Sequence, residues 1–343
     1  MPNPVQRYEQ VVVSGLAHVD APVRVTSAEL EEQIAPTLAR FGLSSGTLES
    51  LSGIVERRMW EPGATPSSVS TEAARRLLAT SPVDVSDIGA LVNTSVDRDF
   101  VEPSTACIVH ANLGLPPEAI NFDVGNACLG FLNGMALVAG MIERGDVDHG
   151  LVVDGEGSRF VTEATIARLA DPAVDKRTFR ESIATLTLGS GSAAMLLSRA
   201  DMVEGGHPFR GFISRAATQH HELCRGQFDD MRTDTRRLLS AGITLARDSY
   251  KEAVEAFDLS NEAVALYAIH QVSRVHSRQV VETLGLDPDK VPLLYPNFGN
   301  IGPAGLVITL SKAVEAGRLT AGDRVAMMGV GSGLNAGLAD IEW

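Results

Sequence analysis

A cysteine at the start of an apolar helix is the first candidate for chemistry in this sequence. Cys128 lies in the stretch NFDVGNACLGFLNGM, in which a predicted strand ends near Val124 and a predicted helix begins at the cysteine. The macrodipole and the free backbone N–H groups of a helix N-terminus stabilise a thiolate and lower the pKa of the thiol. The position therefore favours a nucleophile, although a small core cysteine fits it as well. Cys107 and Cys224 lack this setting, and we expect them to be buried or incidental.

Three polar groups in the second half of the chain are suited to stabilise negative charge. His270 ends a predicted strand (265–270), and the active groups of open α/β sheets gather at the carboxyl ends of strands. Asn300 lies in the Gly-rich turn NFGNIGP before a helix, and its amide is a fixed donor suited to an oxyanion. Ser332 follows an apolar strand in the turn GVGSG, whose backbone N–H groups can donate to the same space. Taken alone, His270 also fits a core or surface histidine, and Asn300 fits an ordinary turn residue.

A carboxylate that can act as a base lies in the first half. Glu102 closes the loop VDRDFVEPST after a predicted strand. Such a residue usually serves in a loop or as a helix cap, but it becomes a general base when it is delivered into a desolvated site. Elsewhere, the adjacent His220 and His221, with Glu222 and Cys224, fit no standard metal-ligand spacing. We therefore expect no metal site.

The composition excludes several classes of protein. The chain has 343 residues, with 29 Lys and Arg against 43 Asp and Glu, a net charge of −14, and 44% of it is apolar. A phosphate-tracking surface needs clustered Lys and Arg, so we expect no nucleic-acid partner. No apolar run approaches the roughly 18 residues that span a bilayer, and the first residues show no signal core. Three cysteines are too few for a disulfide scaffold, so we expect a cytoplasmic protein.

Apolar strands alternate with helix-length segments along the chain and must position these groups. Strands are predicted at residues 11–19, 88–96, 120–124, 149–155, within 186–198, and at 265–270 and 324–330. Helices are predicted at 26–41 (with Thr26 or Ser27 as N-cap), 67–79, 104–113, 129–144, 234–257, 273–284 and 302–316. This alternation predicts an α/β fold with parallel strand pairing and helices on the faces of the sheets.

An internal repeat indicates that the chain contains two related halves. The segments 128–158 and 300–332 share one order of elements: a turn, an apolar helix, a turn with a glycine, an apolar strand and a Gly-x-Gly-Ser turn. The repeat superposes Cys128 on Asn300 and places the chemistry where the halves join. The length also suggests two domains, which we place at residues 1–203 and 204–343, with the junction near 201–208.

Together these motifs resemble the thiolase superfamily, and within it the ketoacyl synthase III-like condensing enzymes. The resemblance rests on the Cys in GNACLGF, the His in HQVS, the Asn in NFGNIGPAG and the late GVGSGLN, and it covers essentially the whole chain in order. It is strongest toward the members that join two acyl-CoAs head to head, in the segments GLAHVDAP, NTSVDRDFVEPSTACIV, VVDGE and LCRG. It implies a thiolase-like α/β fold of two duplicated halves, with central sheets layered between helices (αβαβα).

The resemblance also implies a role for each candidate residue. Cys128 would be the nucleophile that accepts the first acyl group, and the backbone N–H groups of Cys128 and Ser332 would form its oxyanion hole. His270 and Asn300 would bind the carbonyl of the second thioester and stabilise its enolate. Glu102 would remove a proton from the second substrate, and it would reach the site from the neighbouring subunit of a homodimer.

The implied activity is that of an acyl-CoA:acyl-CoA acyltransferase, which joins two long-chain acyl-CoAs in a non-decarboxylative Claisen condensation. The product would be a 2-alkyl-3-oxoalkanoate (a β-keto acid) plus CoA, the first step of head-to-head olefin biosynthesis, with downstream olefin-pathway enzymes as further partners. No cofactor is implied beyond the CoA thioesters. Three alternatives stay open: a ketoacyl synthase III that uses acyl-CoA and malonyl-acyl carrier protein, a Cys–His acyl-CoA thioesterase, and a non-catalytic partner subunit.

The expected contacts to CoA depart from the family pattern. Synthase III enzymes carry a Trp and an Arg for CoA just upstream of a G-I-x-x-R element, but here Thr47 and Leu51 fall at those positions before GIVER. HQVS also stands where synthase III enzymes usually have HQAN. The candidates for contact with the CoA phosphates are therefore other arginines: Arg57, Arg58, Arg215 and Arg225. The preferred acyl chain length is not determined by these motifs.

Overall fold

Ten strands are joined by hydrogen bonds into one sheet in the computed structural model, which describes residues 5–343. The first five are ordered β2 (Val11–Asp20), β8 (Gly191–Arg199), β7 (His149–Glu156), β5 (Ile88–Asn93) and β6 (Ile120–Asp123). The other five are ordered β12 (Val264–Ile269), β13 (Arg324–Gly331), β14 (Asn335–Glu342), β9 (His207–Ala216) and β1 (Val5–Arg7). The two sets meet where β2 pairs with β9 over two residues. The centre of the molecule is therefore a pair of joined five-stranded sheets.

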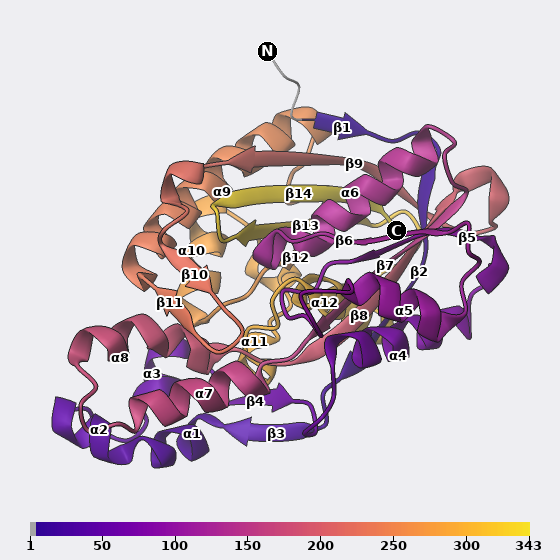
Figure 1. The fold of residues 1–343 in the computed structure, drawn as a ribbon. Coiled ribbons are helices and arrows are strands. Elements are labelled where there is room, and N and C mark those ends of the chain that lie inside the picture. The colour runs from indigo at the N-terminus through magenta and orange to yellow at the C-terminus, as the bar shows by residue number, and fades with distance from the viewer. Residues whose placement is uncertain (1–4) are drawn as a thin grey trace.

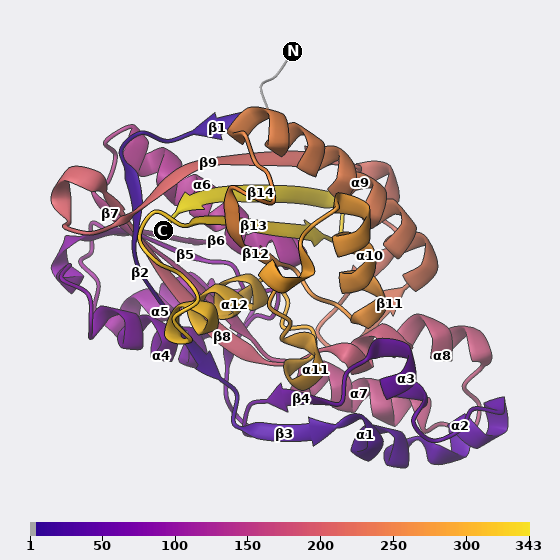
Figure 2. The ribbon, with the colours of Figure 1, turned by 180° about the vertical axis from the view of Figure 1, so that it is seen from behind.

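Helices cover both outer faces of these sheets and fill the space between them. The helices α6 (Gly130–Glu143) and α12 (Ala304–Glu315) lie between the two sheets. The outer face of the first sheet is covered by α4 (Pro66–Leu78) and α5 (Thr105–Leu113). The outer face of the second sheet is covered by α9 (Thr235–Phe257) and α10 (Arg274–Leu284). Figure 1 shows α6 in front of β13 and β14, and Figure 2 shows α9 and α10 on the other side of these strands. The predicted αβαβα layering is confirmed.

The two central helices are buried because their sequences are apolar nearly all round. Leu132 of α6 and Leu310 of α12 are fully buried, and they belong to one core that also includes residues of both sheets. Close approach of α6 to the first sheet requires a glycine. A Cβ at Gly134 would lie 2.7 Å from Thr94 Cγ2 and 2.9 Å from Val152 Cγ1, so any larger residue would push the helix away.

The predicted repeat corresponds to a repeated arrangement of strands. In the first half β7 is parallel to β5 and antiparallel to β8, and in the second half β13 is parallel to β12 and antiparallel to β14. The predicted parallel pairing is therefore confirmed for β5 with β6 and β7 and for β12 with β13, and it is wrong for the antiparallel pairs. Antiparallel strands need only a tight turn, such as the one between Gly331 and Asn335, whereas parallel strands need a crossover. The division at residue 203 stays a prediction, and β1 at the start of the chain pairs with β9 of the second half.

A separate lobe packs beside the sheets, at the lower left of Figure 1. It contains β3 (Val23–Thr26), α1 (Ser27–Gln33), α2 (Ala35–Phe41), α3 (Thr47–Ser52), β4 (Glu56–Met59), α7 (Arg159–Leu169) and α8 (Lys176–Ser182). The single helix predicted at 26–41 is divided at Ile34, because Pro36 near the start of α2 has no N–H to continue α1. Thr26 is the N-cap, as one of the two predicted options, and forms a capping box with Glu29.

Three short elements in the second half of the chain complete the fold. They are the two strands of a hairpin, β10 (Cys224–Gly226) and β11 (Met231–Thr233), and the helix α11 (Tyr295–Phe298). Among residues 5–343, no helix combines the length and the apolar character that a bilayer crossing requires.

We expect the free energy of unfolding to depend strongly on the packing of α6 between the sheets. Leu132→Ala should lower it by about 2–5 kcal/mol, because the fully buried side chain would leave a cavity. The matched control is Leu51→Ala on α3, where the side chain is 57% exposed, and we expect it to change stability by less than about 1 kcal/mol. Urea unfolding followed by circular dichroism measures both, and equal losses would contradict the central position of α6.

Candidate active site

Cys128 lies in a tight turn between β6 and α6. A short 3-10 turn (Ala127–Leu129) contains the cysteine, and the α-helix begins at Gly130, two residues later than predicted. Hydrogen bonds between three asparagine side chains hold the turn. Asn335 Nδ2 donates to Asn126 Oδ1 (2.9 Å), and Asn126 Nδ2 donates to Asn133 Oδ1 (2.7 Å). These bonds fix the nucleophile against both α6 and the β13–β14 turn.

The GVGSG turn lies directly against the cysteine turn. A Cβ at Gly331 would lie 2.7 Å from the Asn126 carbonyl oxygen and 3.0 Å from the Leu129 nitrogen, so only glycine permits this contact. At Gly329 a Cβ would be 3.6 Å from the Cys128 carbonyl oxygen. The end of β13 therefore lies against the cysteine turn directly before Ser332, although Cys128 and Ser332 are 204 positions apart (332 − 128).

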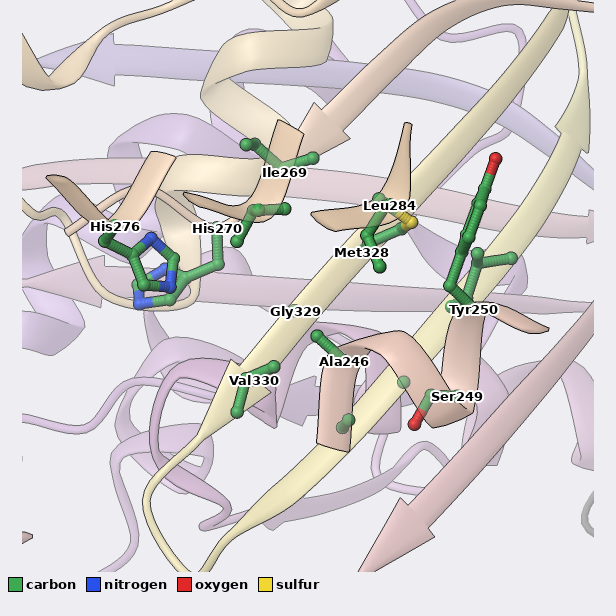
Figure 3. Close-up of a pocket in the computed structure, with 14 residues that line it drawn as sticks. Ala246, Ser249, Tyr250, Ile269, His270, His276, Leu284, Met328, Gly329 and Val330 are labelled. Atoms are coloured by element: carbon green, nitrogen blue, oxygen red, sulfur yellow. The ribbon is translucent and has the colours of Figure 1, made fainter. Parts of the chain in front are cut away.

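His270 follows β12 and is buried beside the same strand. The backbone N–H of His270 donates to the Met328 carbonyl (2.8 Å). The imidazole ring of His270 lies edge-on to that of His276, with 6.0 Å between the ring centroids. Both histidines line a small cavity, and Figure 3 shows them together at one end of it. The volume of the cavity is about 30 Å³. Burial, and then the neighbouring His276, lower the pKa of His270 to about 3, and burial lowers the pKa of His276 to about 4. At neutral pH His270 is therefore an uncharged imidazole.

Asn300 is fixed by its backbone and by one oxygen of its side chain. Its N–H donates to the Thr187 carbonyl (2.8 Å), and its carbonyl accepts from Gly189 N–H (2.8 Å). The side-chain Oδ1 accepts from Gly302 N–H (3.0 Å), which leaves the amide NH2 to donate elsewhere. Gly302 also lies near His270, where its backbone partly offsets the lowering of the pKa of the ring, so this glycine lies beside both predicted donors. The structure thus brings Cys128, Ser332, His270 and Asn300 to one region where the halves meet.

The electrostatics of Cys128 differ from the expectation of a lowered pKa. Burial raises the pKa of its thiol, and the carboxyl group of Glu156 adds to the rise, followed by Cys224 and Asp154. These effects outweigh the helix N-terminus, which begins only at Gly130. Cys128 is therefore a thiol in the resting protein, and it must lose its proton during the reaction.

Glu102 lies apart from this cluster in the single chain. It is exposed at the tip of the loop that joins β5 to α5. Asp99 anchors the loop by accepting hydrogen bonds from Ser67 N–H (3.0 Å) and from Thr105 Oγ1 (3.1 Å). The tip beside Glu102 carries Phe100 and Val101, which are 59% and 84% exposed. The loop is thus fixed at its base and presents a carboxylate and two apolar side chains to the outside.

The four predicted arginines are in different environments. Arg57 is 1% exposed and donates to Ser27 Oγ (3.0 Å) and the Leu186 carbonyl (3.0 Å), so it holds the lobe in place. Arg58 is half-buried over the Phe298 ring, and Arg215 is exposed but paired with Glu252. Arg225 is exposed on β10, with no ion pair among the described residues.

Sequence reasoning missed two groups near the nucleophile. Asp154 and Glu156 are buried at the end of β7, and Cys224 in the β10–β11 hairpin acts electrostatically on Cys128. The available signal was VVDGE, two acidic residues within a strand that is otherwise apolar. Among residues 5–343 no group of three His, Cys, Asp or Glu side chains could hold a metal ion.

We expect the raised pKa of Cys128 to appear in its alkylation by iodoacetamide. Because the thiolate is the reactive form, the rate at Cys128 should still rise above pH 9, whereas free cysteine levels off near its pKa of about 8.5. Site-resolved mass spectrometry separates Cys128 from Cys107 and Cys224, and Cys128→Ala gives the background. A plateau below pH 8 would contradict the electrostatic environment described above.

Comparison with known proteins identifies the family. Residues 122–212 match the model of 3-oxoacyl-[acyl-carrier-protein (ACP)] synthase III, and residues 254–343 match the model of its C-terminal part. Acyl-CoA:acyl-CoA alkyltransferases from Xanthomonas campestris and Shewanella oneidensis are 45% and 36% identical, each covering 98% of this chain and 99% and 100% of their own.

Solved structures agree. A crystal structure of cerulenin-bound OleA from Xanthomonas campestris has a TM-score of 0.96 and 44% identity, covering 98% of both chains. Other structures of that OleA carry replacements of a cysteine, a glutamate or a histidine. This chain therefore belongs to the 3-oxoacyl-[acyl-carrier-protein] synthase III family of thiolase-like condensing enzymes.

Proposed function

We propose that this enzyme condenses two long-chain acyl-CoAs without decarboxylation to a 2-alkyl-3-oxoalkanoate and CoA, as the first step of head-to-head olefin biosynthesis. The observation that carries the proposal is the neutral, buried His270 beside Asn300. A neutral imidazole whose pKa is about 3 can donate a hydrogen bond to an enolate but is a poor base. A separate carboxylate is then needed, and Glu102 is presented for that role. The names of the relatives at 45% and 36% identity support this choice.

The first step is the acylation of Cys128. The thiol sulfur attacks the carbonyl carbon of the first thioester while the backbone N–H groups of Cys128 and Ser332 hold the oxyanion. Collapse of the tetrahedral intermediate breaks the bond to CoA, and the proton of the thiol leaves with the CoA sulfur. The products are the Cys128 thioester and free CoA.

The second step forms the carbon–carbon bond. His270 and the amide of Asn300 donate to the carbonyl oxygen of the second acyl-CoA, and Glu102 removes a proton from its α-carbon. The enolate carbon attacks the acyl-Cys128 carbonyl, and the Cys128 sulfur leaves and recovers a proton. Hydrolysis of the resulting β-ketothioester releases the β-keto acid and the second CoA. Loss of one enolate donor would cost on the order of 3 kcal/mol in the barrier.

A homodimer would complete the site. Glu102 lies on an anchored loop whose tip exposes Phe100 and Val101, a combination suited to burial against a second copy of the chain. In this arrangement the Glu102 of one subunit serves the acyl-Cys128 of the other. A cytoplasmic location, where Cys128 stays reduced, and contact with downstream olefin-pathway enzymes complete the proposal.

Two other activities predict different products. A synthase III would require malonyl-acyl carrier protein and release carbon dioxide, and it would not need Glu102 because decarboxylation generates the carbanion. A thioesterase would release free fatty acid and form no carbon–carbon bond. Incubation with myristoyl-CoA alone, followed by mass spectrometry, separates them: our proposal predicts a β-keto acid of doubled chain length or the ketone derived from it.

We expect Glu102→Ala to stop condensation while sparing the acylation of Cys128. The carboxylate acts only on the second substrate, so intact-protein mass spectrometry should still show the myristoyl adduct, and product formation should fall at least about 100-fold. Cys128→Ala should abolish the adduct itself. Glu204→Ala, which removes another exposed carboxylate, is the matched control and should change neither step. Full product formation by Glu102→Ala would remove Glu102 as the base.

We expect Arg225→Ala to raise the KM for acyl-CoA roughly 5- to 10-fold with little change in kcat. Its guanidinium is exposed and has no ion-pair partner within residues 5–343. It is next in sequence to Cys224, whose thiol lies close enough to act on Cys128, so it can reach the phosphates of a bound CoA. Arg236→Ala removes an exposed arginine elsewhere and is the control. An unchanged KM in steady-state kinetics would exclude Arg225 from CoA binding.

A further inference from the structure

A buried pair of carboxyl groups at the end of β7 has no part in the chemistry proposed above. Asp154 is 0% exposed and Glu156 is 8% exposed, and Arg98, whose charge acts on Asp154, forms its ion pair with Asp123 instead. Burial raises the pKa of Asp154 to about 7, although hydrogen bonds from Thr94 and Glu156 oppose the rise. Burial, and then the neighbouring Asp154, raise the pKa of Glu156. Among residues 5–343, Asp154 Oδ1 has no N–H or hydroxyl donor, and the carboxyl group of Glu156 is near enough to donate to Asp154 when it holds a proton. A buried acid of this kind is retained only where its hydrogen bonds are used.

The pair extends the contact between β5 and β7 beyond the end of the ladder. The last ladder pair is Asn93 with Val153. Thr94 N–H still donates to the Val153 carbonyl (2.9 Å), and side chains take part in the bonds that follow: Thr94 Oγ1 donates to Asp154 Oδ2 (2.5 Å). Gly155 N–H donates to Ser95 Oγ (2.8 Å), and Val96 N–H donates to Glu156 Oε1 (2.6 Å). As a result, the chain stays beside β7 through Val96 and leaves the sheet at Asp97.

The segment that leaves at this point is the loop that carries Glu102. Val96 is six residues before Glu102 (102 − 96), and the bond from its N–H to Glu156 is the last hydrogen bond that this segment makes to β7 before Glu102. The later anchors, Arg98 on Asp123 and Asp99 on Ser67, hold the loop to other elements. The direction in which the loop departs therefore depends on the Glu156 carboxyl group.

We propose that Glu156 is a positioning residue for the base-bearing loop. By accepting the Val96 N–H, it sets where the loop leaves the sheet and so holds Glu102 in the place from which it serves the active site of the second subunit. The inference rests on the proposed function, in which Glu102 acts across a dimer. In this arrangement a buried residue of one subunit, Glu156, affects catalysis at the active site of the other subunit.

A second mode of action must be separated from this one. Glu156 also packs against Gly302, where an added Cβ would lie 3.2 Å from Glu156 Cδ, and it contributes to the raised pKa of the Cys128 thiol. Glu156 could therefore act on its own subunit's Asn300 and Cys128. The two modes predict effects in different subunits of the dimer.

Mixed dimers with one composite site distinguish the modes. A subunit with Cys128→Ala, which supplies Glu102, is combined with a subunit with Glu102→Ala, which supplies Cys128, and the pair is purified through two different tags. Glu156→Ala is then placed in one subunit or the other. We expect condensation to fall on the order of 10- to 100-fold when it is in the Glu102-supplying subunit, and to change less than about threefold in the other, with acylation of Cys128 unchanged in both.

Two further variants test the hydrogen bond itself. Glu156→Gln keeps an acceptor for Val96 N–H and a donor for Asp154, so it should restore condensation in the Glu102-supplying subunit. If Glu156→Ala does not fold, Val96→Pro in the same subunit removes the N–H donor from the other end of the bond and should give the same loss.

Other results would overturn the inference. A loss only in the Cys128-supplying subunit, equal losses in both, or failure of Glu156→Gln to restore activity would each show that Glu156 does not act by positioning the loop. The parent mixed dimer tests the proposed function separately. If it shows no more condensation than its two homodimers, the transfer of Glu102 across the interface is wrong, and the inference is overturned with it.

Discussion

The close packing of α6 between the two sheets is the constraint on which the rest of the structure depends. The helix is apolar nearly all round, so it is stable only where both sides are covered. Its approach requires Gly134 against the first sheet and Gly331 of β13 against the turn that precedes it. That contact places Cys128 at the end of β13 and fixes the distance between the two halves. The active region is thus a consequence of how the central layer is packed.

Burial also determines which proton-transfer roles are available in this region. Removing water favours the neutral forms of ionisable groups, and His270, His276, Cys128 and the Asp154–Glu156 pair all follow that rule. A site of neutral donors can stabilise an enolate, but it contains no strong base. This explains why the proposed base lies on an exposed loop, where a carboxylate keeps its charge in water until a partner or substrate covers it.

Local signals predicted much of the secondary structure, and long-range pairing limited the rest. Helix starts were found where a cap was present, as at Thr26, and Ser273 proves to cap α10 at its predicted start. The strands β9 and β14 were missed, although they lie at the centre of the second sheet. Their hydrogen-bond partners are supplied by distant segments, and their burial by α9, so nothing in their own sequence marks them as strands.

By itself the sequence indicated the candidate reacting groups, the thiolase-like fold and the family, because these depend on residue types and on the order of motifs. Only the tertiary structure decided the protonation states of the candidate groups and which residues surround them. It showed that Cys128 is a thiol rather than a thiolate and that Arg57 is a core residue. It also showed that Asp154 and Glu156 accept hydrogen bonds from Thr94 and Val96, at the start of the loop that carries Glu102. The physical reason is that ionisation depends on solvent exposure and on neighbours that are remote in the chain. In a sequence, Glu102 and Glu156 are the same residue type; in the fold one is exposed and the other is enclosed.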